Sequence, residues 1–449
     1  MSQYLKELSE NLIKTAQKYG ATAAESIVIE NKSLSIEVKN QALEKVEKSD
    51  ALDLGIRVFI NSQSACASIS STNKEAIDEM IQRAIAMAKE STTDKYSHPA
   101  SSHETVRDWN QDDFVLFDET YESQKFQTFK DLTLEIESSA LETKAISQCE
   151  STGFGSNLSD FHFASSNGFS GGYKKTAFQL FCSAIAGEGS SMERDYSSEQ
   201  RTFFNDLPPP AEIGQLAAKR AIERLNPRRP RTGLYPVIFD QRISGSLIGH
   251  LTSAINGEAI CRGSSWLLNS LNKKILSDSL TLCENPKRPK ISGSRPFDGE
   301  GLMTTKKNFI ENGILKHYIL DLRTARKLKL EPTGNAYRSL SSAPQPSVGN
   351  LELSQGENSV KELIGNIKEG LLVTSLIGST INQNTGDYSR GANGFWIENG
   401  EIVFPVNECT IAGNLKEMLL NIVAANDGKE YLSKVIPSLL VNEMTIAGG

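Results

Sequence analysis

The chain has 449 residues, a net charge of −7 and 38% hydrophobic residues, which predicts a globular protein of two or three domains. The negative charge disfavours nucleic-acid binding, since the two short basic segments, 226–231 and 285–290, are broken by prolines and lack interleaved aromatic residues. No apolar run reaches the length of a membrane span, and the N-terminus has no apolar signal core, so we expect a cytoplasmic protein without membrane contact.

Helices and hairpins dominate the first part of the chain. We predict a helix, a strand, a hairpin turn and a second helix at residues 4–19, 33–40, 61–63 and 72–90. Thr72 and Glu75 match a capping box at the start of that second helix. Residues 91–118 are polar and have no clear period, which predicts a long connection.

A second unit of mixed structure follows. Two helices, over 124–143 and 211–225, enclose strands with glycine, serine and asparagine turns. The proline-rich segment 226–233 predicts a domain boundary. We therefore expect an N-terminal α+β domain at 1–226, either undivided or divided into 1–115 and 116–226, and a C-terminal domain at 227–449.

The C-terminal domain is predicted to be mostly antiparallel β structure with a few helices. Asn-Gly pairs predict hairpin turns near 311–313 and at 399–400, with a helix over 360–368 between them. Helices and strands do not alternate regularly along the chain. That argues for the α+β class with antiparallel sheets rather than a doubly wound parallel sheet.

The cysteines and histidines do not form a local metal motif. The six cysteines contain no C-x-x-C pair, and no two of the five histidines share a helical turn. Buried, reduced thiols are the expected state of the cysteines in a chain of this size. Neither a phosphate-binding G-x-x-x-x-G-K-[ST] nor a dinucleotide-binding G-x-G-x-x-G in its strand-to-helix context occurs, so nucleotide cofactors are not predicted.

One segment matches a nucleophile pattern. "GFSGG" at 168–172 fits G-x-S-x-G with Ser170 in the nucleophile position. That chemistry requires a strand, a sharp turn and then a helix. Residues 173–184 alternate as a strand does, so we predict a hairpin turn in which glycine and serine serve the backbone.

A second candidate is the segment "NTGDYSRG" from Asn384. It gathers four functional side chains between two glycines: Asp387, Tyr388, Ser389 and Arg390. As a loop it could bind a peptide terminus or a partner, with Arg390 as a bidentate donor to a carboxylate. The alternative is an Asx-type turn with Arg390 in a structural ion pair.

The stretch "SLIGHLTSAINGE" at 246–258 predicts a helix with one histidine. A catalytic zinc needs three protein ligands and a nearby base, and helical zinc motifs supply two histidines and a glutamate together. Here His250 stands alone and Glu258 lies eight residues further on. Spacing alone therefore predicts a packed or surface histidine.

Several long segments resemble the PmbA/TldD family, once called modulators of DNA gyrase. They are "INGEAICRGSSWL", "FDGEG", "NFIENGILKHYILDLRTARKL", "TGNAYR" and "TGDYSRGANGFWIENGEIVFPVNECTIAGN". The resemblance covers nearly the whole chain and is densest from Tyr235 onward. It implies one of two branches: TldD-like metallopeptidase subunits with H-E-x-x-x-H and a late cysteine, or PmbA (TldE) subunits that lack this site.

Alignment on "GSS" at 263–265 places the two histidine positions at Ile248 and Ser253 and the glutamate position at Gly249. None of these side chains can bind zinc or act as the base. No cysteine follows Cys409, which lies in a PmbA-type segment. The resemblance therefore implies the PmbA/TldE branch, with no catalytic or metal-binding residues in this chain.

The first hypothesis is a non-catalytic subunit, inactive alone, whose TldD-like partner supplies the zinc. The resemblance implies peptides or unfolded small proteins as substrates, and a homodimer is plausible for the isolated chain. The second hypothesis is a free-standing enzyme that uses Ser170 or a dispersed site. The third is a regulatory binder of DNA gyrase or another protein without a proteolytic role.

Overall fold

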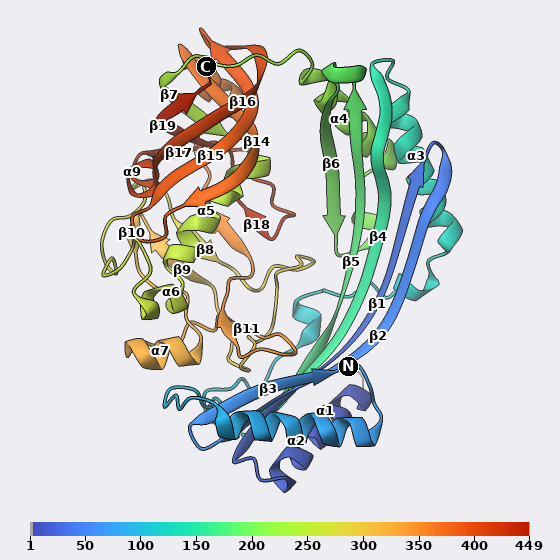
Figure 1. The fold of residues 1–449 in the computed structure, drawn as a ribbon, viewed down its shortest axis with the longest axis vertical. Coiled ribbons are helices and arrows are strands. Elements are labelled where there is room, and N and C mark those ends of the chain that lie inside the picture. The colour runs from blue at the N-terminus through green and yellow to red at the C-terminus, as the bar shows by residue number, and fades with distance from the viewer. Residues whose placement is uncertain (1–2, 449) are drawn as a thin grey trace.

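The computed structural model describes residues 3–448, apart from the side chains of 379 and 380. A long, bent sheet forms one side of the molecule and a compact β-rich body forms the other (Figure 1). The α+β class with mainly antiparallel sheets is confirmed. No helix between residues 3 and 448 combines the length and the hydropathy that a membrane crossing requires.

The long sheet is antiparallel and has the order β3-β2-β1-β4-β5-β6. Its strands are β1 Ala23–Lys39, β2 Ala42–Ile60, β3 Gln63–Ile69, β4 Ile146–Ser165, β5 Ser170–Ala186 and β6 Glu193–Arg201. Because β1 pairs with β4 along 14 positions, from Glu25↔Ser165 to Val38↔Thr152, one sheet crosses the suggested division at 115/116. The segment 91–118 is the expected long connection, with only the short η1 within it.

Helices cover one face of this sheet in two pairs. They are α1 Gln3–Lys18, α2 Lys74–Glu90, α3 Phe126–Leu141 and α4 Pro210–Glu223, with 3-10 turns η1 Gln111–Asp113, η2 Tyr121–Ser123, η3 Gly189–Ser191 and η4 Phe204–Asp206. The apolar stripes of α1 and α2 form one core, and those of α3 and α4 form another. The predicted cap at Thr72 is wrong: Asn73 caps α2, because its side chain accepts from the backbone N–H groups of Glu75 and Ala76.

The C-terminal half is built around a closed barrel. Strand β16 pairs with β15 and also with β19, so the order β16-β15-β14-β7-β19 returns to its start. The strands are β7 Gly233–Phe239, β14 Glu369–Ile381, β15 Asp387–Glu398, β16 Glu401–Asn414 and β19 Leu439–Ala447, with β17 Ile422–Ala424 beside β19. Only β7 and β14 run parallel in this sheet. The closing contact joins residues 410–412 of β16 to residues 445–447 of β19.

Short elements surround the barrel. A second sheet has the order β10-β9-β8-β13-β18, and β11 pairs with β12. Their bounds are β8 Leu282–Glu284, β9 Lys307–Glu311, β10 Ile314–Leu315, β11 Ala336–Tyr337, β12 Gln345–Pro346, β13 Leu351–Leu353 and β18 Lys434–Val435. The helices are α5 Gln241–Ala254, α6 Gly257–Arg262, α7 Leu322–Leu328, α8 Val360–Gly365 and α9 Leu415–Leu420.

The two halves meet on the face of the long sheet that the helices leave open. Phe297 from the C-terminal half packs edge-on against Phe169 and Tyr173, with ring centroids 5.0 and 5.6 Å apart. A buried ion pair lies nearby, between Arg338 and Glu25 at 2.7 Å. Aromatic packing and a desolvated ion pair together join the halves.

Candidate functional site

Helix α5 carries the positions where the sequence resemblance places a metal motif. Asp240 caps its start by accepting the backbone N–H of Arg242 at 2.9 Å. Leu247 and Leu251 recur at helical spacing, and both are buried in the barrel core. This apolar stripe fixes the rotation of α5 and therefore the direction in which every other side chain on it points.

Ile248 lies in the same core and is 1% exposed. Gly249 faces open space, since a Cβ atom there would meet nothing within 4 Å. Ser253 is exposed, and its hydroxyl donates to the Gly249 carbonyl at 2.9 Å. Of the three positions, the first faces the hydrophobic interior, and the other two carry neither an imidazole to bind zinc nor a carboxylate to take a proton from water.

His250 lies between these positions, beside a cavity of about 230 Å³. Its ring meets that of Tyr388 at an angle of 74°, with centroids 5.9 Å apart. The His250 Nε2 and the Tyr388 hydroxyl are both buried without a hydrogen-bond partner among the described residues. Burial, and then the nearby Arg390, lower the pKa of His250, so the ring is neutral at pH 7.

A larger cavity of about 560 Å³ continues from the smaller one, and Ser253 and Gln383 line both. It lies between α6, the connection at 91–97 and the segment 343–346. We call the two cavities together the α5 groove. The groove therefore runs along the junction between the N-terminal sheet and the C-terminal body.

Ion pairs fix the floor of the α5 groove. Arg323 on α7 pairs with Asp94 at 2.7 Å and also with Glu258 on α6. The Arg323 pair holds the pKa of Asp94 below its usual range, despite the opposing effect of burial. Glu258 is thus engaged in a structural ion pair and does not act as the missing base of a metal site.

The donor set does not fit a catalytic metal. Among residues 3–448, no three histidine, cysteine, aspartate or glutamate side chains converge in a way that could hold an ion. Cys409 is buried on β16, where its thiol donates to the Ala392 carbonyl at 3.1 Å. Burial raises the pKa of this thiol to about 11, which disfavours the thiolate that a metal would require.

The prediction of a loop at Asp387–Arg390 is wrong. These four residues open strand β15 and pair with β14 and β16, while the turn precedes them, around Asn382. Tyr388 points into the core, and Arg390 Nε donates to the Gly378 carbonyl at 2.7 Å. Alternation along the strand explains the error, because it buries one of the four side chains that a loop would have presented together.

Ser170 lies where the β4–β5 hairpin begins its second strand, as its turn context predicts. The sequence did not reveal that His162 Nε2 would lie 3.0 Å from the Ser170 hydroxyl. That hydroxyl donates to Glu10 at 3.0 Å, so the histidine N–H donates to the serine and the serine proton points away from the ring. Burial lowers the pKa of His162 to about 4, which makes it a weak base. The trio is a structural network.

Comparison with known proteins decides the family. Profiles of PmbA/TldA metallopeptidases match in three parts: domain 1 at residues 24–88, the central domain at 119–225 and the C-terminal domain at 232–448. The chain belongs to the PmbA/TldD metallopeptidase family.

Relatives within this family align over almost the whole chain. The metalloprotease PmbA of Escherichia coli O157:H7 is 35% identical, covering 99% of this chain and 97% of that protein. The metalloprotease PmbA homolog of Haemophilus influenzae is 33% identical, covering 99% and 96%. A metalloprotease TldD homolog of Buchnera aphidicola is 28% identical over an aligned region that covers 47% of this chain and 44% of that protein.

Solved structures share the fold. A candidate modulator of DNA gyrase from Bacteroides thetaiotaomicron superimposes with a TM-score of 0.92 at 27% identity, covering 100% of both chains. TldE from Thermococcus kodakarensis superimposes with a TM-score of 0.83 at 22% identity, covering 98% of this chain and 99% of that chain. The second likeness concerns the fold alone.

Proposed function

We propose that this chain is the non-catalytic, PmbA/TldE-type subunit of a cytoplasmic heteromeric metallopeptidase. A TldD-like partner supplies the zinc site, and the substrates are peptides or unfolded small proteins. The observation that carries the proposal is the placement of Ile248. It packs in the barrel core, and the family resemblance places the first histidine of the TldD-like motif at this position.

The chemistry of zinc hydrolysis supports this assignment. The metal needs three protein ligands and an open position, and a carboxylate must accept the proton of the attacking water. The corresponding positions here hold Ile248, Gly249 and Ser253, whose side chains offer neither. A single substitution could not create a site, because one of the three positions faces the hydrophobic interior.

The α5 groove gives such a subunit a physical role. Polar side chains and paired charges line it, with Asp94, Glu258 and Arg323 on its floor and the exposed Arg262 at its wall. A wall of this kind suits an extended peptide, whose backbone groups need hydrogen-bond partners whatever its sequence. Folded proteins cannot expose a continuous backbone in this way, so such a groove selects unfolded chains.

Reconstitution tests the proposal. We expect the chain to copurify with a TldD-like subunit and the complex to cleave an unstructured peptide in a chelator-sensitive manner. A partner variant whose motif glutamate is replaced by glutamine should abolish cleavage, whereas Gly249→Ala in this chain should leave it intact. Failure of the two proteins to associate would contradict the proposal, as would cleavage that persists with the glutamine variant. The isolated chain is proposed to form homodimers, which light scattering can measure.

A further inference from the structure

A separate cavity of about 250 Å³ lies between the two halves of the molecule. Strands β1, β4 and β5 form one wall, and segments 295–299 and 336–338 form the other. It shares no lining residue with the α5 groove. Tyr337 belongs to its lining and is 62% exposed, so the cavity opens to solvent beside this ring. We call it the interdomain cavity.

Aromatic rings supply most of the apolar lining. Phe161 and Tyr173 pack edge to face with centroids 4.4 Å apart, and Phe297 approaches them from the opposite half at 6.1 and 5.6 Å. Phe163 also lines the cavity. These rings hold one another in place, which gives a preformed surface for a flat or compact apolar group.

Lys175 introduces a charge into this apolar space. Its ammonium donates to the backbone carbonyls of Ser292 at 3.1 Å and Ser294 at 2.8 Å. No carboxylate within the described part of the chain lies at ion-pair distance from it. Burial, and to a smaller extent the neighbouring Arg295, lower the pKa of Lys175 to about 7.

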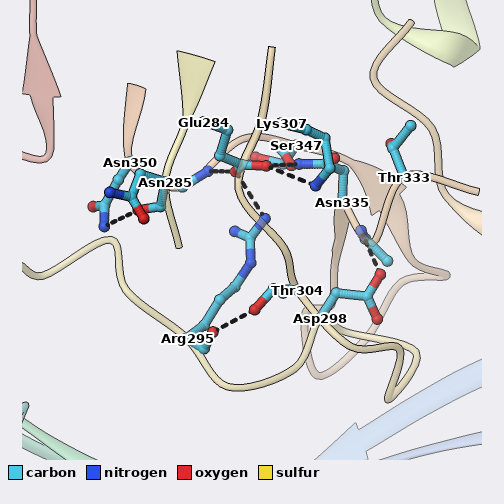
Figure 2. A network of polar contacts seen from close by, with 12 residues as sticks. Glu284, Asn285, Arg295, Asp298, Thr304, Lys307, Thr333, Asn335, Ser347 and Asn350 are labelled. Carbon is cyan, nitrogen blue, oxygen red and sulfur yellow. Dashed lines mark hydrogen bonds and ion pairs between the residues drawn. The ribbon is translucent and has the colours of Figure 1, made fainter. Parts of the chain in front are cut away.

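The other charges in the lining already have partners. Arg338 pairs with Glu25, and Arg295 pairs with the buried Glu284, which also accepts from Asn335 (Figure 2). The Asp298 carboxylate accepts backbone N–H groups at residues 300, 302 and 336. Lys175 is thus the cation of the described lining that lacks a carboxylate partner.

We propose that the interdomain cavity binds a compact organic carboxylate with an aromatic or similarly apolar body. The carboxylate pairs with the Lys175 ammonium, and the body packs among Phe161, Tyr173 and Phe297. Tyr173 also lines the cavity, and its hydroxyl offers the carboxylate a second donor. A multiply charged phosphate would fit poorly, because only one cation is unmatched and the remaining surface is mainly aromatic.

Binding of a carboxylate is coupled to the protonation of Lys175. The ligand favours the charged ammonium, so affinity is constant below about pH 7 and falls as the pH rises above it. The other titratable or charged groups in the lining are Tyr173, Arg295, Asp298, Tyr337 and Arg338. Loss of the pH dependence in a Lys175 variant would therefore assign it to that residue.

Calorimetric titration of the full chain with phenylacetate tests the proposal. We expect saturable binding at millimolar concentrations, and roughly tenfold weaker binding at about pH 8.5 than at about pH 6. Lys175→Met should weaken binding roughly tenfold or more and abolish the pH dependence. Ser159→Leu, which places a larger side chain in the lining, should also weaken binding while leaving every charge in place.

Three controls make the titration decisive. Lys219→Met, the same substitution on the exposed face of α4, should bind as the wild type does. Acetate and benzyl alcohol, which each lack half of the recognised chemistry, should bind at least tenfold more weakly than phenylacetate. A short peptide with a C-terminal phenylalanine, compared with its amidated form, distinguishes a peptide terminus from a free small acid as the ligand.

Each outcome bears on the proposal. Absence of saturable phenylacetate binding to the folded wild-type chain would overturn it. Equal affinity of the wild type and of Lys175→Met would also overturn it, provided that circular dichroism shows the variant to be folded. If that variant does not fold, unchanged affinity in Ser159→Leu would have the same consequence.

Discussion

Glu25 is the carboxylate that joins the two halves of the chain, and its replacement by glutamine tests how strongly they are linked. Its Oε2 atom lies 2.7 Å from Arg338 and 3.6 Å from Arg57. All three side chains are at least 95% buried. Removing one partner of a buried ion pair leaves uncompensated charge and typically costs about 3–5 kcal/mol.

The expected loss of unfolding free energy in Glu25→Gln lies near the lower end of that range. Arg57 retains its hydrogen bond to Ser97 at 2.6 Å, and Arg338 retains its bond to the Gly299 carbonyl. We therefore predict that Glu25→Gln lowers the free energy of unfolding by about 3 kcal/mol. Equilibrium unfolding in urea, followed by circular dichroism at pH 7, measures this quantity.

A matched control lies on the same strand. Glu30→Gln makes the same substitution at a partly exposed position and should change the unfolding free energy by less than about 0.5 kcal/mol. Adding Arg338→Met to Glu25→Gln should recover part of the loss, since it removes one of the stranded charges. A loss below about 1 kcal/mol for Glu25→Gln would refute the view that this ion pair links the halves.

Three further predictions concern α5, the neighbouring α6 and the buried His162 on β4. Ile248→His should cost about 3 kcal/mol or more in urea unfolding, because it places a polar ring in the barrel core, whereas Ser253→His at the exposed position should cost less than about 0.5 kcal/mol. Gly257→Ala should destabilise by about 1–3 kcal/mol, since its Cβ would lie 2.6 Å from the Thr324 hydroxyl, while Gly249→Ala should stabilise by about 0.5–1 kcal/mol. The pKa of His162, lowered from 6.5 to about 4, means that the unfolded state binds the proton more tightly, so stability falls by about 3 kcal/mol as the pH drops through this window. Unfolding at stepped pH should show this loss in the wild type and a smaller one in His162→Gln.

Local sequence signals were sufficient for most helices and hairpins. The turn predicted at 61–63 separates β2 from β3, and the Asn-Gly pair at 399–400 separates β15 from β16. Such signals succeed because turn chemistry and the spacing of apolar residues act over a few residues. The predicted helix 360–368 ends at Gly365, since the chain turns there toward the barrel strand β14.

The sequence did not predict which distant segments of the chain come together. Closure of the barrel depends on a pairing between β16 and β19, and nothing in either strand alone specifies its partner. The α5 groove gathers segments as distant as 91–97 and 343–346. The contact of His162 with Ser170 is local, because the hairpin register pairs His162 with Gly172 and Ala164 with Ser170. A register assigned from the predicted turn would have placed these two side chains near each other.

The metal content and activity of the isolated chain test the central claim most directly. The chain, purified free of any TldD-like protein, should contain far less than one equivalent of zinc by elemental analysis and should leave an unstructured peptide intact. One tightly held zinc per chain, together with chelator-sensitive cleavage of that peptide, would contradict the assignment of this protein as a non-catalytic subunit.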